Sequence, residues 1–229
     1  MNKKVSEETQ DGNALDQTIT RNIADLQKKG FDTEDQTTLQ SCIEDTVEKE
    51  RAQNVADKDL NDKTAEQNAA VQETTTLIKK VRNAALTGYS TDKRTLALFN
   101  AGINKKLPDS VNGVRTECVY LNTVIPGRET VLLKSGLQQE DITLMINAPA
   151  RIVAIDKSQE DAKKIREAAT LARDLSVKAL KAIKKKIRNF VKTAFADNSV
   201  MLVQFEPIPK GRGGSSTPPP EDPPTPPAQ

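Results

Sequence analysis

The sequence predicts an all-α fold, and three observations support this prediction. Apolar residues recur at spacings of three and four over most of the chain. Residues 33–86 contain neither proline nor glycine, as expected of a long helix. The same plan of apolar residues and turns then recurs about 106 residues later. We therefore expect an elongated, pseudo-two-fold helical bundle built from a duplicated unit of short helix, glycine turn and long helix.

The repeat is clearest in two blocks that align without an insertion between them. Residues 30–39 align with residues 136–145, and both segments begin with glycine and carry a Glu-Asp pair. Residues 79–83 read Lys-Lys-Val-Arg-Asn, and residues 185–189 read Lys-Lys-Ile-Arg-Asn. This basic element lies near the C-terminal end of each predicted long helix, where cations oppose the helix dipole. It is consistent with that structural role or with a paired binding site.

Four segments follow from this pattern. We expect a flexible N-terminus over residues 1–12, helical repeat unit 1 over 13–107 and helical repeat unit 2 over 108–208. Residues 209–229 are rich in Gly, Ser and Pro and predict a disordered tail. Proline-rich segments either bind aromatic grooves of a partner protein or act as spacers, and both roles stay open for this tail.

The first unit is predicted to contain three helices. A short helix over 13–29 ends at Gly30, and a long helix then begins at a Thr33–Gln36 capping box and runs to about residue 86. The cluster of Asp and Asn over 57–62 leaves a break in that helix open. A short amphipathic helix, capped by Ser90 or Thr91, closes the unit with Leu96, Leu98 and Phe99.

The second unit follows the same plan with more interruptions. Its first helix, about 116–134, is interrupted at Pro126-Gly127 and ends at Gly136. The long helix begins near Gln139, is interrupted at Pro149, and resumes after a Ser158–Asp161 capping box. Its apolar and small residues then predict one buried seam: Ile165, Ala169, Ala172, Ser176, Ala179, Ile183, Ile187, Phe190 and Ala194.

Composition argues against catalysis. The chain has no histidine, the usual general base and metal ligand, and no carboxylate cluster or glycine-rich loop with the spacing of a metal or phosphate site. We expect no enzyme activity, no catalytic residue, no cofactor, no metal and no small-molecule substrate. Cys42 and Cys118 are interpreted as buried thiols in a reducing compartment. The absence of an apolar leader or membrane span predicts a cytoplasmic protein, with export by a non-classical route left open.

Charge is distributed unevenly. Residues 1–75 carry 9 basic against 17 acidic residues, whereas residues 76–196 carry 23 against 11. Two interpretations follow: the halves complement one another inside the fold, or unlike ends of different molecules attract. The densest basic stretch forms a candidate site for a polyanion or another partner. Its members are Lys178, Lys181, Lys184, Lys185, Lys186, Arg188 and Lys192.

These features predict a non-enzymatic structural or protein-interaction protein that self-associates into a homo-oligomer or a larger assembly. The alternative is a module that binds a polyanion, either nucleic acid or anionic lipid, through the basic helix over 178–192. No aromatic residue is interleaved with these lysines, so a base-stacking site is not indicated.

Overall fold

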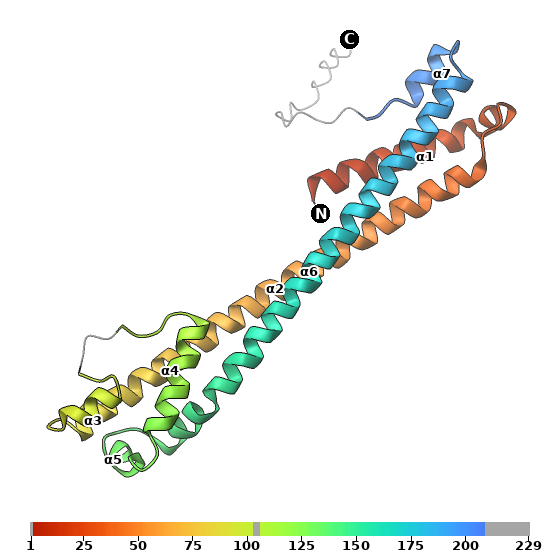
Figure 1. The fold of residues 1–229 in the computed structure, drawn as a ribbon. Helices are drawn as coiled ribbons and strands as arrows, with labels where there is room; N and C mark the ends of the chain where they lie inside the picture. Colours follow the sequence, from red (N-terminus) through yellow and green to blue (C-terminus); the bar gives the residue numbers. More distant parts are fainter. Residues whose placement is uncertain (1, 103–105, 209–229) are drawn as a thin grey trace, which may run out of the picture. The chain divides into compact units, whose positions relative to one another are not determined.

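The computed structural model describes residues 2–102 and 106–208, and the predicted proline-rich tail lies outside these residues. Within the described part the regular secondary structure is helical throughout, which confirms the all-α prediction (Figure 1). The helices are α1 (Lys3–Lys28), α2 (Thr33–Gly88), α3 (Lys93–Leu98), α4 (Val111–Val124), α5 (Glu129–Lys134), α6 (Gln139–Ala194) and α7 (Ser199–Gln204).

Helix boundaries recur at a constant separation. Gln139, the first residue of α6, lies 106 residues after Thr33, the first residue of α2, and Ala194 lies 106 residues after Gly88. Likewise α7 begins and ends 106 residues after α3. This separation equals that of the two aligned sequence blocks, so residues 106 apart are called equivalent below.

The chain forms two compact units, each assembled from segments distant in sequence. Unit 1 comprises residues 1–47 and 176–229, and unit 2 comprises residues 48–175. Each unit therefore combines part of the first predicted repeat with part of the second. The predicted boundary at 107/108 follows the sequence repeat and is not a boundary between the compact units.

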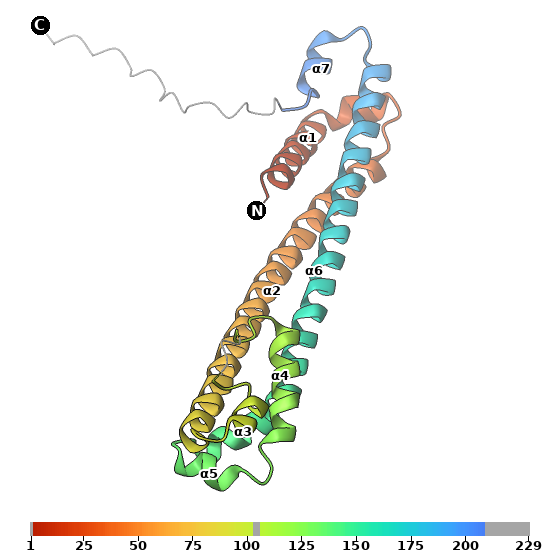
Figure 2. The ribbon, with the colours of Figure 1, turned by 60° about the vertical axis from the view of Figure 1, so that its left-hand side comes forward.

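Unit 1 contains α1, the first part of α2, the last part of α6, and α7. Figures 1 and 2 show α1 and α7 beside the last part of α6. Its core is aliphatic with a few aromatic rings, and the buried side chains come from all four helices and the turn after α1. They are Leu15, Ile19, Leu26, Phe31, Leu39, Ile43, Leu180, Ile183, Ile187, Val191, Phe195, Met201 and Phe205.

Unit 2 contains the rest of α2, the first part of α6, and the short helices α3, α4 and α5 (Figure 2). Its core is also mainly aliphatic. The largest fully buried side chains in it are Ile78, Val81, Phe99, Leu121, Leu132 and Met145. Each core therefore takes side chains from both long helices, because a single helix cannot bury its own apolar face.

The N-terminal segment corrects one prediction. Residues 3–12 are helical rather than flexible, and α1 begins ten residues earlier than expected. The Asn2 side chain caps the helix by accepting from the Lys4 N–H, and Val5 and Glu8 are buried. Gly12, the last residue of the segment expected to be flexible, lies inside α1, where a Cβ would be 3.0 Å from Ile43 Cγ1. Close packing of α1 against α2 therefore accounts for this glycine.

Both long helices are continuous. The Asp/Asn cluster does not break α2, and the predicted interruption of α6 at Pro149 is wrong. Pro149 has no N–H to donate to the Met145 carbonyl, and α6 continues without that bond. The next carbonyl, that of Ile146, accepts a hydrogen bond of 3.2 Å from the Asn122 amide of α4. Ser158 lies within α6, so the predicted capping box there is also wrong.

The first helices of the two repeats differ in continuity. α1 is unbroken, whereas the equivalent region is divided into α4 and α5 at Pro126-Gly127, as predicted, with Gly127 at φ 76°. The helix expected to begin near residue 116 begins at Val111 instead, because Ser110 accepts from the Gly113 N–H. α3 is capped by Asp92 rather than by Ser90 or Thr91, and α2 by Asp32, which accepts from the Glu34 N–H.

The residues before both long helices adopt the same turn. Gly30 and Gly136 have φ values of 87° and 97°. The Phe31 N–H donates to the Leu26 carbonyl, and the Leu137 N–H donates to the Leu132 carbonyl, each at 3.1 Å. This six-to-one bond is the Schellman arrangement, which uses a left-handed residue that glycine adopts without strain.

Replacing Gly136 tests this turn. No neighbouring atom lies within 4 Å of the position of a new Cβ, so the effect of Gly136→Ala comes from the backbone alone. We expect a loss of about 1 kcal/mol in the free energy of unfolding, with a smaller loss for Gly136→Asn, because Asn tolerates positive φ. Urea unfolding followed by circular dichroism measures both, and equal losses would contradict the prediction.

Candidate functional site

The seven candidate basic residues all lie on the last part of α6, within unit 1. They do not share one solvated face of the helix, because neighbouring helices of unit 1 cover some of them. Of the seven, Lys184 is buried and Arg188 is half-buried. Four of the seven, these two included, make ion pairs with acidic side chains of unit 1. The residues in these pairs are Lys181, Lys184, Lys186 and Arg188.

Lys184 is the clearest departure from the prediction. Its side chain is 3% exposed, and its ammonium Nζ lies 2.7 Å from Glu8 Oε2 and 2.9 Å from Asp11 Oδ2. It also donates to the Glu8 carbonyl oxygen at 2.9 Å. A buried cation requires such partners, because burial without them would cost several kcal/mol. Lys184 therefore attaches α6 to α1 and is not accessible to a polyanion.

Arg188 makes a second attachment one turn further along α6. Its guanidinium donates from Nη2 to Asp11 Oδ1 at 2.7 Å and from Nη1 to Asp11 Oδ2 at 3.1 Å. Its Nε donates to the Phe205 carbonyl oxygen at 2.9 Å, just after α7. The planar fork of the guanidinium fits this paired geometry, which a lysine would not reproduce. Arg188 thus joins α1, α6 and the end of α7.

Asp11 is the acidic centre of this cluster. Burial raises the pKa of its carboxyl, but hydrogen bonds from Arg188 and Lys184 outweigh burial and lower the pKa to about 2. The backbone N–H of Ile208 adds a further bond of 3.0 Å to Oδ1. Asp11 is therefore ionised throughout the neutral range and stabilises unit 1 in that form.

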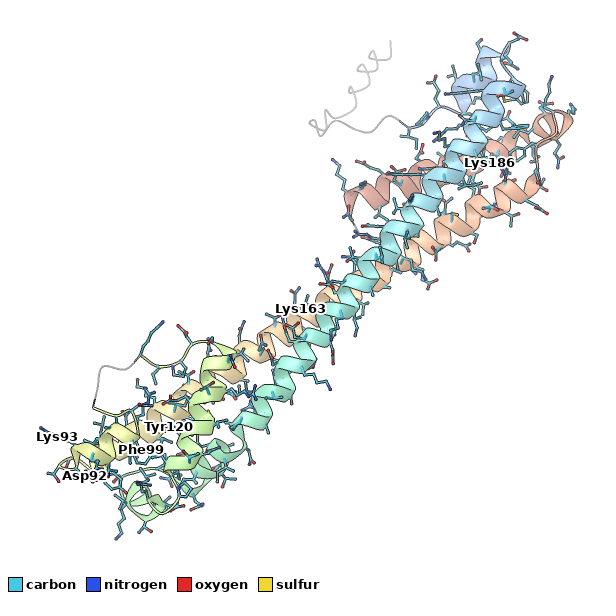
Figure 3. The ribbon with its side chains drawn as sticks, in the orientation of Figure 1. Asp92, Lys93, Phe99, Tyr120, Lys163 and Lys186 are labelled. Carbon is cyan, nitrogen blue, oxygen red and sulfur yellow. The ribbon has the colours of Figure 1, made fainter. Side chains whose placement is uncertain are left out.

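Two outer pairs complete the contacts. Lys181 lies 3.4 Å from Glu8, and Lys186, labelled in Figure 3, pairs with Asp35 near the start of α2. The acidic partners all belong to the N-terminal part of the chain. In unit 1 the charged halves therefore complement one another inside the fold, which is the first of the two interpretations of the charge asymmetry.

The other three candidates remain on the surface. Lys178, Lys185 and Lys192 are exposed and, within the described residues, make neither a hydrogen bond nor an ion pair. They are seven residues apart and so lie along one face of α6. The accessible basic surface is thus a row of three lysines rather than a patch of seven cations.

Unit 2 contains equivalent ion pairs. Lys80 pairs with Asp141 at 2.8 Å, as Lys186 pairs with Asp35. Arg82 pairs with Glu117 at 2.6 Å, as Arg188 pairs with Asp11. All four residues in unit 2 are equivalent to their counterparts in unit 1. The second lysine and the arginine of the repeated Lys-Lys-Val/Ile-Arg-Asn element therefore have a structural role within each unit.

The two units differ at the buried lysine. The residues equivalent to Lys184 and Glu8 are Ile78 and Val114, and both are fully buried in the core of unit 2. A buried ion pair in unit 1 thus corresponds to a pair of aliphatic side chains in unit 2. Neither the Glu8–Lys184 ion pair nor the pair of aliphatic side chains Val114 and Ile78 leaves a buried charge without a partner of opposite charge.

The predicted seam of α6 is correct only in part. Ser176, Ile183 and Ile187 are buried in unit 1, but Ile165 of unit 2 is 58% exposed. The exposed apolar side chains of this region form what we call the α6 outer stripe. It consists of Ile165, Ala168, Leu171, Ala172 and Leu175, of which Ala172 is half-buried. The predicted seam therefore combined residues from two faces of α6, one of which is buried and one exposed.

A shallow hollow of about 290 Å³ in unit 2 borders the Lys80–Asp141 pair and is lined partly by Ala84, Leu137 and Ser135. The equivalents of Ala84 and Leu137 in unit 1 are Phe190 and Phe31, whose rings lie 5.4 Å apart. At two positions that line the hollow, unit 2 therefore carries smaller side chains than unit 1 does at the equivalent positions.

The Cys118 thiol is buried in the core of unit 2. Burial, with a smaller contribution from the adjacent Glu117 carboxylate, raises the pKa of the Cys118 thiol to about 12, so it is a poor nucleophile at neutral pH. Within residues 2–102 and 106–208 no group of three or more Cys, Asp or Glu side chains is placed to hold a metal ion. None of the helices described is long and apolar enough to cross a bilayer.

Comparison with known proteins gives no relative for this chain. No protein-family model matches it, and neither the curated proteins nor the solved structures contain a significant match.

The equivalence of Glu8–Lys184 with Val114–Ile78 makes a stability prediction. Lys184→Ile removes the cation that lies 2.7 Å from the buried Glu8 carboxylate and 2.9 Å from Asp11, and we expect a loss of about 3 kcal/mol in the free energy of unfolding. The double variant Glu8→Val/Lys184→Ile should return to within about 1 kcal/mol of the wild type. Lys185→Ile, at the exposed neighbour, is the control. A double variant as unstable as the sum of the single variants would contradict the equivalence.

The lowered pKa of Asp11 predicts a pH dependence. Because the pKa is about 2 when folded and near 3.8 when unfolded, the ionised group contributes its full stabilisation above about pH 4. That contribution, about 2 kcal/mol, is lost as the pH falls through 2. The difference in unfolding free energy between wild type and Asp11→Asn should therefore shrink between pH 5 and pH 2. A difference that is constant over this range would show that Asp11 is not ionised preferentially in the fold.

Proposed function

We propose that this chain is a non-enzymatic helical interaction protein that self-associates through the outer surface of α6. The observation that carries the proposal is the α6 outer stripe. Ile165, Leu171 and Leu175 are 58%, 62% and 57% exposed within eleven residues of one helix. Single exposed aliphatic residues are common, but a continuous apolar stripe on a soluble helix is typical of a surface that packs against a partner.

The fold does not require these side chains. The residues of α2 equivalent to Ile165, Ala168 and Ala172 are Asp59, Asp62 and Glu66, which are also on the surface. The equivalents of Leu171 and Leu175 are Ala65 and Ala69, so α2 carries no large aliphatic side chain at any of the five positions. Since α2 and α6 have the same length and equivalent ion pairs, packing within the chain does not account for the apolar residues on α6. A contact with another molecule would account for these apolar residues.

We also propose that the chain arose as a duplicated helical unit with approximate two-fold symmetry. The constant separation of the helix boundaries and the equivalent pairs of Lys80, Lys186, Arg82 and Arg188 support this proposal. If one unit was duplicated, a residue type that differs between equivalent positions was changed in one copy after the duplication. The outer stripe of α6 is such a difference.

The polyanion alternative has less support. Four of its seven candidate residues, Lys184 among them, are engaged by acidic side chains of unit 1. A row of three lysines offers little more than a solvated helix face. The proposed partner role of the proline-rich tail concerns residues outside those described.

Disrupting the stripe tests self-association. Size-exclusion chromatography with light scattering should give a mass above the 25.1 kDa of one chain for the wild type at micromolar concentration. Leu171→Glu/Leu175→Glu should lower the mass to that of the monomer, because burying two carboxylates in a helix interface costs several kcal/mol. The far-ultraviolet circular dichroism should not change.

A matched control uses two other exposed aliphatic residues. Val200 and Val203 of α7 are 68% and 65% exposed, so Val200→Glu/Val203→Glu adds the same charge elsewhere on the chain. This variant should keep the mass of the wild type. If the wild type is a monomer at every concentration, or if both double variants dissociate equally, the proposed role of α6 is wrong.

A further inference from the structure

We infer that the partner of the α6 outer stripe is the same stripe of a second copy, and that the two helices pack antiparallel to form a closed dimer. This inference rests on the proposed self-association and adds its geometry. Ile165, Ala168, Ala172 and Leu175 follow one another at spacings of three, four and three residues. That is the spacing of a coiled-coil seam, so the surface fits another helix rather than a flat or extended partner.

The sizes of the side chains fit self-pairing. When two copies of α6 cross antiparallel at the level of residue 170, Ala168 lies opposite the Ala172 of the second copy. Ile165 then lies opposite the second copy's Leu175. Two alanine layers at the centre allow the helix axes to approach closely, and a large aliphatic layer closes each end.

The flanking charges select the antiparallel orientation. Lys164 and Asp174 flank the two ends of the stripe, and their side chains are 74% and 62% exposed. Lys164 also pairs with Asp161 at 3.4 Å, and Asp174 accepts from Arg173 at 2.7 Å. In an antiparallel pair Lys164 lies near the second copy's Asp174, and the contact occurs twice. A parallel, in-register pair would instead place Lys164 beside Lys164 and Asp174 beside Asp174.

A contact with this two-fold symmetry involves two chains and no more. Both copies use the same surface, so no stripe is left to recruit a third molecule. The inference therefore specifies a discrete dimer and not an open filament. Lys163, labelled in Figure 3, marks the part of α6 that would lie in the contact.

Spin-label distances between two chains distinguish the orientations. Lys157→Cys and Glu167→Cys, both exposed, are labelled one at a time in full-length Cys42→Ala/Cys118→Ala protein whose mass by light scattering equals that of the wild type. In the antiparallel pair the two copies of residue 157 are separated by about 40 Å along the helix axes, because each lies 13 residues from the centre. The two copies of residue 167 are separated by less than about 20 Å.

The expected result is a long distance for the label at 157 and a short one for the label at 167, with both lost on adding Leu171→Glu/Leu175→Glu. Short distances at both sites would show a parallel pair. A dimeric mass with no short distance at 167 would place the contact elsewhere. Either result overturns this inference and leaves self-association standing, whereas a monomeric mass for the unlabelled wild type overturns both.

Discussion

The arginine–carboxylate pair on each long helix is the interaction on which the rest of this structure depends. Arg188 holds α1 and the end of α7 to α6 in unit 1, and Arg82 holds α4 to α2 in unit 2. Both arginines are largely buried, so removing either carboxylate would leave a buried cation without its ion-pair partner, at a cost of about 3–5 kcal/mol. Because each pair joins a segment of one predicted repeat to the long helix of the other, neither repeat forms a compact unit alone.

This constraint changes the meaning of the charge asymmetry. The basic end of α6 suggests a surface for nucleic acid or lipid when it is considered as sequence alone. In the structure much of that charge is directed inward, toward Glu8, Asp11 and Asp35. The part of the α6 surface that packing within the chain does not explain is apolar rather than basic. At the positions equivalent to the outer stripe of α6, α2 carries three carboxylates and two alanines, and the proposed protein contact gives a physical reason for that difference.

Helix type and turn positions could be predicted from the sequence because they depend on local chemistry. The spacing of Leu15, Ile19 and Leu26 specifies a helix, and a glycine after it specifies the turn. The interruption at Pro126-Gly127 was also visible, since proline and glycine together rarely continue a helix. Tertiary contacts decided the remainder. Pro149 lies within a continuous α6, which its local sequence did not indicate. Gly12 lies within α1, where Ile43 of α2 packs closely against it.

The candidate site was harder to predict for a physical reason. Lys184 is surrounded in sequence by other lysines, and nothing local distinguishes a cation that will be buried from one that will be solvated. Its partner Glu8 lies 176 residues away. Comparing residues 106 positions apart gives a signal, because Ile78 and Val114 occupy the positions equivalent to Lys184 and Glu8. That comparison requires knowing which segments meet, which only the fold supplies.

Hydrogen–deuterium exchange on an Arg188→Met variant tests most directly whether these pairs hold the fold together. The account predicts faster exchange in residues 3–28 and 199–208, which Arg188 joins to α6, and unchanged exchange in residues 111–175 of unit 2. The matched Arg82→Met variant should show the reverse, with faster exchange in α4. Equal acceleration across the chain in both variants, or no change in α1 for Arg188→Met, would contradict the central role of the arginine pairs.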